Sequence, residues 1–217
     1  MGKLFISGGG DGEQTKVVDT IFTGEIDKDK PLLYIPIARE PNETEYGSCF
    51  DWIHSVFNPL GINEITMWTD LNNKTVADVR QFSAIYIGGG NTTSLYKELI
   101  DTGFDKVLVN YFNSGGVIYG GSAGAIIMGS NIMTCAYSDP NHVGLTYFEG
   151  LNLVKDYSIW CHYEEKEDSL IQDFIEKYNK PVISLPEGTA IFVNRDGLQV
   201  IGTENAVVFE DGRKKIM

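Results

Sequence analysis

The sequence predicts one α/β domain over residues 1–217, a doubly wound and mostly parallel sheet with helices on both faces. Short apolar runs alternate with segments of helical spacing, which is the order that βαβ units produce. The apolar runs lack a period of two, as is typical of strands buried on both faces. The chain has no internal repeat or linker, and 217 residues can bury a substantial core.

Strands and helices are expected to alternate up to residue 121. The strands are the apolar runs at 3–7, 31–38, 62–68, 83–90 and 117–121. The helices are the segments of helical spacing at 15–22, 48–60, 76–82, 92–103 and 104–116. Gly61 is a stop signal after the second helix, and Thr92 or Thr93 is available to cap the fourth.

The pattern changes after about residue 180. Apolar runs follow at 182–188, 190–202 and 206–216, and the last two are each interrupted by turn residues. Arg195-Asp196-Gly197 and Glu210-Asp211-Gly212 are both hairpin signals. The parallel body is therefore expected to end in antiparallel strands.

Composition and charge exclude several function classes. The chain is 42% hydrophobic with a net charge of −13, whereas binding to nucleic acid or to an anionic membrane requires surplus Lys and Arg. The N-terminal apolar run is too short for a secretory signal, and no stretch approaches a membrane span. Cys49, Cys135 and Cys161 form no C-x-x-C pair, which argues against disulfides and a zinc site. We expect a cytoplasmic protein without metal or organic cofactor.

Glycine-rich loops end three of the predicted strands, at 7–13, 87–93 and 119–125. The carboxyl ends of parallel strands meet at one rim, where ligands of α/β sheets bind. The first loop does not have the G-x-G-x-x-G spacing of a dinucleotide site, and no acidic residue ends a second strand about 20 residues further on. Nucleotide binding is therefore a minor alternative to a simple turn.

The third loop, YGGSAGA at 119–125, matches G-x-S-x-G between a strand and a helix. This is the context of a nucleophile elbow, in which a tight turn exposes the serine hydroxyl. Ser122 is thus the candidate nucleophile, and the N–H of Ala123 can face a developing oxyanion. A glycine-rich turn without catalytic role is the competing interpretation.

A serine nucleophile needs a base, and the chain offers three histidines. His162 follows an apolar run directly, which places it at the same rim and makes it the best candidate. His54 lies within a predicted helix and His142 in a polar loop, where surface roles are the default.

Two carboxylates could orient that histidine. Asp139 lies in the loop beyond the elbow helix, and Glu187 ends a predicted strand in SLPEGTA. Each could also be a turn former beside Pro or Gly. The loop Gly88-Gly89-Gly90-Asn91 could supply a second oxyanion N–H or hold the substrate backbone, with a simple turn as the alternative.

Together these motifs resemble peptidase family S51, which includes aspartyl dipeptidase (peptidase E) and cyanophycinase. The resemblance rests on GGGNT at 88–92, GGSAGA at 120–125, His162 and LPEG at 185–188. It implies a flavodoxin-like fold similar to class I glutamine amidotransferase domains. It also implies that Ser122 is the nucleophile, that His162 is the base, and that the Gly90 and Ala123 N–H groups form the oxyanion hole.

The chain departs from the family pattern in two places. The triad acid of aspartyl dipeptidases follows the elbow helix, and Asp139 fits that position only with a small insertion; Glu187 matches another acidic position and is preferred. The family places arginines after the histidine to pair with an aspartyl side chain, but Lys166 is the only cation in residues 162–174. Lysine is not equivalent to a bidentate arginine, so N-terminal Asp specificity is not expected.

The sequence thus predicts a serine hydrolase that cleaves a short peptide or related amide through an acyl-enzyme on Ser122. The alternative is a non-catalytic module that binds a small molecule or peptide at the same rim. The expected partner is a small peptide, with no nucleic acid and no membrane, and a homodimer is left open.

Overall fold

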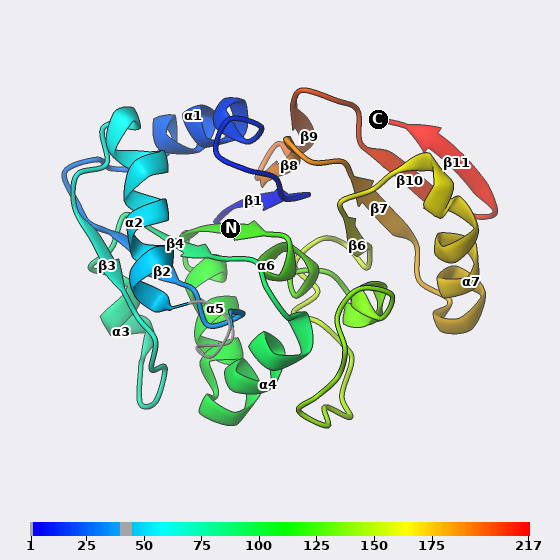
Figure 1. The fold of residues 1–217 in the computed structure, drawn as a ribbon, viewed down its shortest axis with the longest axis horizontal. Coiled ribbons are helices and arrows are strands. Elements are labelled where there is room, and N and C mark those ends of the chain that lie inside the picture. Colours follow the sequence, from blue (N-terminus) through cyan, green and yellow to red (C-terminus); the bar gives the residue numbers. More distant parts are fainter. Residues whose placement is uncertain (1, 40–44) are drawn as a thin grey trace.

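The computed structural model describes residues 2–39 and 45–217. The central sheet contains β1 (Lys3–Ser7), β2 (Leu32–Ile35), β3 (Ile65–Met67), β4 (Ala84–Ile87), β5 (Val117–Gly121), β8 (Thr189–Asn194) and β9 (Gly197–Gly202). Their order across the sheet is β3-β2-β4-β5-β1-β8-β9 (Figure 1). β1 to β5 run parallel, whereas β8 and β9 pair antiparallel at one side. The predicted α/β sheet is therefore confirmed.

Helices cover both faces of this sheet. They are α1 (Lys16–Gly24), α2 (Tyr46–Phe57), α3 (Val76–Val79), α4 (Thr92–Thr102), α5 (Phe104–Asn113) and α6 (Ala123–Ile126). Alternate strand residues point to opposite faces. In β1, Leu4 and Ile6 pack with the cluster under α3 to α6, and Phe5 packs with the cluster under α1 and α2. Both faces are apolar, which explains why the strands show no alternation in sequence.

The face under α1 and α2 is unusually aromatic. The rings of Tyr86 and Tyr119 are stacked with centroids 4.5 Å apart, and Phe5 stacks on Phe192 at the same separation. Phe22 of α1 meets Tyr119 edge to face at 5.2 Å. Such pairs add stability beyond the area they bury, and they line the sheet up to the rim.

The remaining strands form a separate sheet. It contains β6 (Ser158–Cys161), β7 (Val182–Leu185), β10 (Val207–Glu210) and β11 (Arg213–Ile216), in the order β11-β10-β7-β6. β6 and β7 are parallel and are connected through α7 (Asp168–Tyr178). Ile171 and Phe174 of that helix pack in one cluster with Trp160.

The predicted antiparallel C-terminal strands are present, but they divide between the two sheets. β8 and β9 extend the central sheet, while β10 and β11 extend the sheet of β6 and β7. β1 already pairs with β5 on one side and with β8 on the other, so neither of its edges is left for β6 or β7. These two strands consequently pair with each other and bring their carboxyl ends to the same rim.

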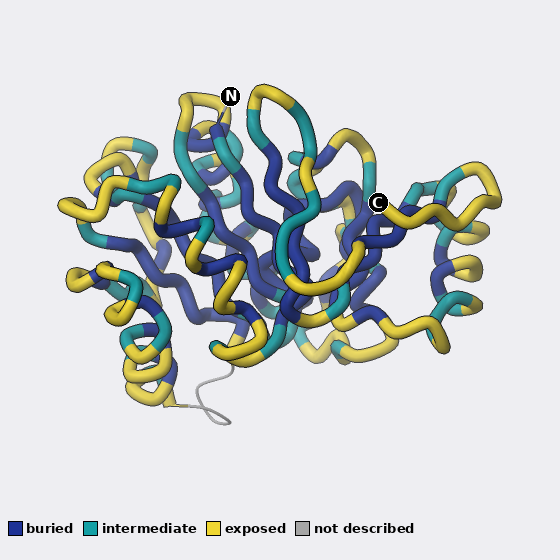
Figure 2. Tube along the Cα trace, turned by 90° about the horizontal axis from the view of Figure 1, so that it is seen from above, coloured by how far each residue is buried: buried dark blue, intermediate teal, exposed yellow. Residues whose placement is uncertain are grey.

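Several element ends differ from the expected ones. β4 ends at Ile87, because Gly88 to Gly90 turn away from the strand. The helix expected over 48–60 becomes α2 followed by a 3₁₀ turn at Asn58–Leu60, where Pro59 cannot donate a backbone hydrogen bond. Figure 2 shows buried central strands between exposed connections. No helix within residues 2–39 and 45–217 has both the length and the apolarity needed to cross a membrane.

Candidate active site

Ser122 occupies a strained turn between β5 and α6. Its φ of 51° and ψ of −112° are rare for a residue with a side chain. The glycines around it are required by close approach: a Cβ on Gly120 would lie 2.3 Å from the Gly124 carbonyl oxygen. A Cβ on Gly124 would lie 2.4 Å from the Ile87 carbonyl oxygen of β4. The turn therefore holds the Ser122 hydroxyl beyond the end of the sheet.

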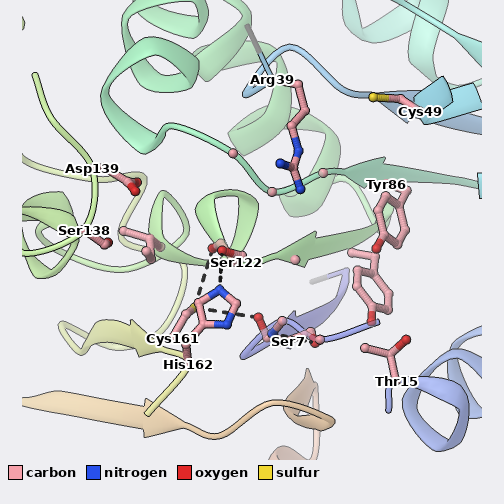
Figure 3. A pocket seen from close by; sticks show the side chains of 18 of the residues that line it. Ser7, Thr15, Arg39, Cys49, Tyr86, Ser122, Ser138, Asp139, Cys161 and His162 are labelled. Atoms are coloured by element: carbon pink, nitrogen blue, oxygen red, sulfur yellow. Dashed lines mark hydrogen bonds between the residues drawn. The ribbon is translucent and has the colours of Figure 1, made fainter. Parts of the chain in front are cut away.

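His162 directly follows β6 and reaches the serine from the second sheet. Its Nε2 lies 2.9 Å from the Ser122 Oγ (Figure 3). The backbone is also in a left-handed conformation here, with φ of 54°, and its N–H donates to the Gly8 carbonyl at 3.0 Å. The loop after β1 therefore fixes the position of the histidine.

Glu187 contacts the other side of the imidazole. Its Oε1 lies 2.9 Å from the His162 Nδ1, and its Oε2 accepts a hydrogen bond of 2.8 Å from the Gln14 Nε2. These bonds from His162 and Gln14 lower the pKa of the Glu187 carboxyl. The carboxylate is thus ionised at neutral pH and can only accept, which favours the neutral imidazole tautomer that carries its proton on Nδ1 and has Nε2 as the acceptor.

Asp139 has a different environment. Its Oδ2 accepts hydrogen bonds from the Thr92 backbone N–H at 2.8 Å and from the Thr92 hydroxyl at 2.6 Å. Asp139 therefore holds the start of α4, whereas Glu187 is the carboxylate hydrogen-bonded to His162. Neither other histidine joins the site: His142 is exposed, and the ring of His54 on α2 bonds to Asn58 in the 3₁₀ turn that follows that helix.

The loop after β4 faces Ser122. A Cβ on Gly89 would lie 3.0 Å from the Ser122 Cβ, so a larger residue would crowd the serine there. Among hydrogen bonds between described residues, none uses the N–H of Gly89, Gly90 or Ala123. Asn91 instead caps α4, because its Oδ1 accepts from the Ser94 N–H at 2.9 Å.

The serine and histidine open into a cavity of 660 Å³. Tyrosines from three neighbouring strands, Tyr34, Tyr86 and Tyr119, line one side of it. Among the described residues, its charged lining side chains, besides His162, are Arg39, Asp139 and Glu167. Among the described residues, no three His, Cys, Asp or Glu side chains are grouped to hold a metal ion.

A buried polar group lies behind the tyrosines. Asp19 is 1% exposed, and its Oδ2 accepts a bond of 2.7 Å from the Thr15 hydroxyl. Burial raises the pKa of this carboxyl to about 6, an effect that the Thr15 and Tyr119 hydroxyls oppose. Neither the Asp19 Oδ1 nor the Tyr119 hydroxyl has a hydrogen bond of ordinary geometry to a described residue. These buried polar atoms without a partner reduce the stability of the folded protein at this part of the pocket wall.

Sequence reasoning missed several residues of the site. Gln14 and Arg39 carry no motif, and only the tertiary structure brings them to Glu187 and the cavity. Ser7 ends β1 at the first glycine loop, and its place at the rim could have been inferred from that position. Cys161 was considered only as a possible disulfide or zinc ligand, but it lines the cavity: its thiol contacts the Ser122 carbonyl oxygen at 3.5 Å, and burial raises its pKa.

Comparison with known proteins identifies the family. The sequence model of peptidase family S51 matches residues 4–201. Peptidase E of Actinobacillus pleuropneumoniae serotype 5b is 31% identical over 198 residues, covering 85% of this chain and 80% of the relative. A probable alpha-aspartyl dipeptidase of Drosophila melanogaster is 25% identical over 194 residues, covering 83% and 76%.

Solved structures agree with this result. A candidate peptidase E from Listeria monocytogenes superposes with a TM-score of 0.72 at 25% identity, covering 94% of this chain and all of the other. A peptidase from an acI-B1 actinobacterium, at 20% identity, shows the same fold with a TM-score of 0.77, over 100% of this chain and 94% of its own. The chain therefore belongs to peptidase family S51 and is a serine-type peptidase.

Proposed function

We propose that the protein hydrolyses a short peptide through an acyl-enzyme on Ser122, with His162 as general base and Glu187 as the residue that orients it. The observation that carries this proposal is the unbroken chain of contacts from the Ser122 Oγ to His162 Nε2 and from His162 Nδ1 to Glu187, each 2.9 Å long. Both distances are within the reach that proton transfer requires.

The contacts support the following sequence of proton transfers. The Ser122 Oγ attacks the scissile carbonyl carbon while its proton moves to the His162 Nε2. The resulting imidazolium is stabilised by the ionised Glu187 and then gives its proton to the leaving amine. Water next attacks the acyl-enzyme with the same histidine as base, which releases the acid and restores Ser122.

Backbone groups are proposed to stabilise the oxyanion. The N–H of Ala123 follows the nucleophile directly, and the N–H of Gly89 or Gly90 comes from the loop across from Ser122. The closeness of Gly89 to the Ser122 Cβ supports this assignment. Two fixed N–H donors in such a position stabilise the tetrahedral intermediate by several kcal/mol.

The names of the relatives guide the choice of substrate. The Listeria and Actinobacillus proteins are named for peptidase E, and the Drosophila protein for alpha-aspartyl dipeptidase. A dipeptide-sized substrate is consistent with a cavity of 660 Å³. The competing function is binding of a peptide without hydrolysis. It would require that Ser122 does not attack the bound peptide, although its hydroxyl is hydrogen-bonded to His162.

A fluorophosphonate probe and a dipeptide panel test this function. We expect mass spectrometry to locate one adduct on Ser122. The Ser122→Ala variant should form no adduct, and its kcat should be about 10⁶-fold lower than that of the wild type. Circular dichroism of the variant checks that it is folded. Folded wild-type protein that forms no adduct and cleaves no dipeptide would contradict the proposal.

A further inference from the structure

The cavity has a marked charge asymmetry. Apart from His162, Arg39 is the only cationic side chain among the described residues that line it. No local pattern predicts an arginine here, because Arg39 lies more than a hundred residues before the segment after His162 that was expected to carry one. Lys166, the cation in that segment, pairs instead with Glu164 at 2.7 Å and does not line the cavity.

Arg39 lies beside the loop that faces Ser122. A Cβ on Gly90 would lie 2.2 Å from the Ala38 carbonyl oxygen and 2.9 Å from the Arg39 backbone N. The Asn91 N–H donates to that same Ala38 carbonyl at 2.7 Å. Because Gly89 in turn faces Ser122, one short loop separates the arginine from the nucleophile.

The side chain of Arg39 turns into the cavity. Arg39 is an exposed residue that lines the cavity, and Figure 3 shows its side chain pointing from the edge of the cavity in the direction of Ser122. Its charge also acts on the Tyr34 phenol, a lining residue whose hydroxyl lies close to Gly88. The guanidinium is therefore positioned to meet a group bound next to the serine.

The two acidic side chains among the described lining residues, Asp139 and Glu167, already accept hydrogen bonds from other residues. Asp139 is on the other side of Ser122 from Arg39 in Figure 3 and accepts two bonds from Thr92. The Glu167 Oε2 accepts from the Trp160 indole N–H at 3.2 Å. An anionic part of a substrate is thus repelled from one side of the nucleophile and attracted to the other.

We propose that Arg39 is a specificity-determining residue that binds a carboxylate of the peptide substrate beside the scissile bond. This inference rests on the proposed peptidase function and specifies its substrate class: short peptides that bear a free carboxylate within about one residue of the cleaved bond. A guanidinium binds a carboxylate through two parallel N–H···O bonds, which an amide cannot reproduce. The carboxylate is either the C-terminus or an acidic side chain.

Four peptides separate these two sources. Ala-Leu and its C-terminal amide differ only in the terminal carboxylate, and Asp-Leu-amide and Asn-Leu-amide differ only in the side-chain carboxylate. We expect Arg39→Gln to lower kcat/KM for the peptide whose carboxylate Arg39 binds by about 10- to 100-fold, to the value of its amide partner. Arg39→Lys should recover part of the preference, because lysine keeps the charge but not the paired bonds.

Arg80→Gln is the matched control, since Arg80 is exposed at the end of α3 and lies outside the cavity. It should leave all four values unchanged. The inference is overturned if wild-type protein treats both pairs equally, if Arg39→Gln lowers all four values alike, or if Lys166→Gln removes the preference instead. Each of these results leaves the peptidase function intact.

Calorimetry covers the case in which wild-type protein cleaves none of the four peptides. Their binding to wild-type and to Arg39→Gln protein is then compared directly. If wild-type protein binds a carboxylate peptide more tightly than its amide partner and Arg39→Gln protein does not, the inference is supported even though no peptide is hydrolysed. Equal binding of the carboxylate and amide peptides contradicts it.

Discussion

Gly9 packs against the imidazole of His162, so that a Cβ at position 9 would lie 2.4 Å from the ring Cε1 and 2.9 Å from Nε2. The loop after β1 therefore forms one wall of the histidine's site. Together with the bond from the His162 N–H to Gly8, this contact explains how a residue of the second sheet is held against a serine of the first.

Gly9→Ala should therefore inactivate the protein. The added methyl group must displace the ring of His162, and a displacement of about 1 Å from the serine costs on the order of 100-fold in rate. Because Gly9 has a φ of +100°, backbone strain also destabilises the variant. Peptide hydrolysis and the thermal unfolding midpoint are measured together.

Gly115→Ala separates the two effects. Gly115 has nearly the same φ, +103°, but no atom lies within 4 Å of its added Cβ. This control should unfold at a lower temperature as well, yet keep the wild-type rate below its unfolding midpoint. Equal activity losses in both variants would show that the ring contact does not matter.

Glu187→Gln tests the choice of orienting acid. The amide keeps the shape of the side chain but removes the negative charge that stabilises the His162 imidazolium. We expect kcat to fall by about 10² to 10⁴-fold with little change in KM. Asp139→Asn should cost less than about tenfold, because Asp139 bonds to Thr92 and not to the imidazole. A larger loss in Asp139→Asn would reverse the assignment.

Asp19 should make stability depend on pH. Its carboxyl has a pKa of about 6 in the folded protein against 3.8 ordinarily, so between these values the folded state binds more protons than the unfolded state. The free energy of unfolding therefore falls as the pH rises through this window, by about 2–3 kcal/mol in total. Denaturant unfolding at pH 4 and pH 7.5 measures the change.

Asp19→Asn should remove this dependence and stabilise the protein at pH 7.5. The new side-chain carbonyl can still accept from Thr15, and its amide can donate toward the unpartnered Tyr119 hydroxyl. Asp51→Asn, on the exposed surface of α2, is the control and should change stability by less than about 0.5 kcal/mol. If the Asp19→Asn variant is less stable than wild type at pH 7.5, the buried charge of Asp19 does not destabilise the folded protein.

The amino-acid sequence by itself determined the parallel α/β sheet, the elbow at Ser122, and the presence of His162 and Glu187 at strand ends. These features are local: glycine spacing and continuous apolar runs specify a strand and its turn without reference to distant residues. The rule that carboxyl ends of parallel strands share a rim then brought the candidates together in principle.

Only the tertiary structure decided which carboxylate meets His162 and which cation enters the cavity. Asp139 and Glu187 are both acidic residues beside turns, and nothing local distinguishes them. The choice depends on the pairing of β6 with β7, because it puts the last residues of these strands, Cys161 and Leu185, side by side. His162 and Glu187, which follow them closely in the chain, therefore come together. In the same way, Arg39 lines the cavity beside the glycine loop because Gly90 packs on the Ala38 carbonyl, a contact between segments some fifty residues apart in the chain. Such contacts follow from how sheets pair and pack, which no short stretch of sequence encodes.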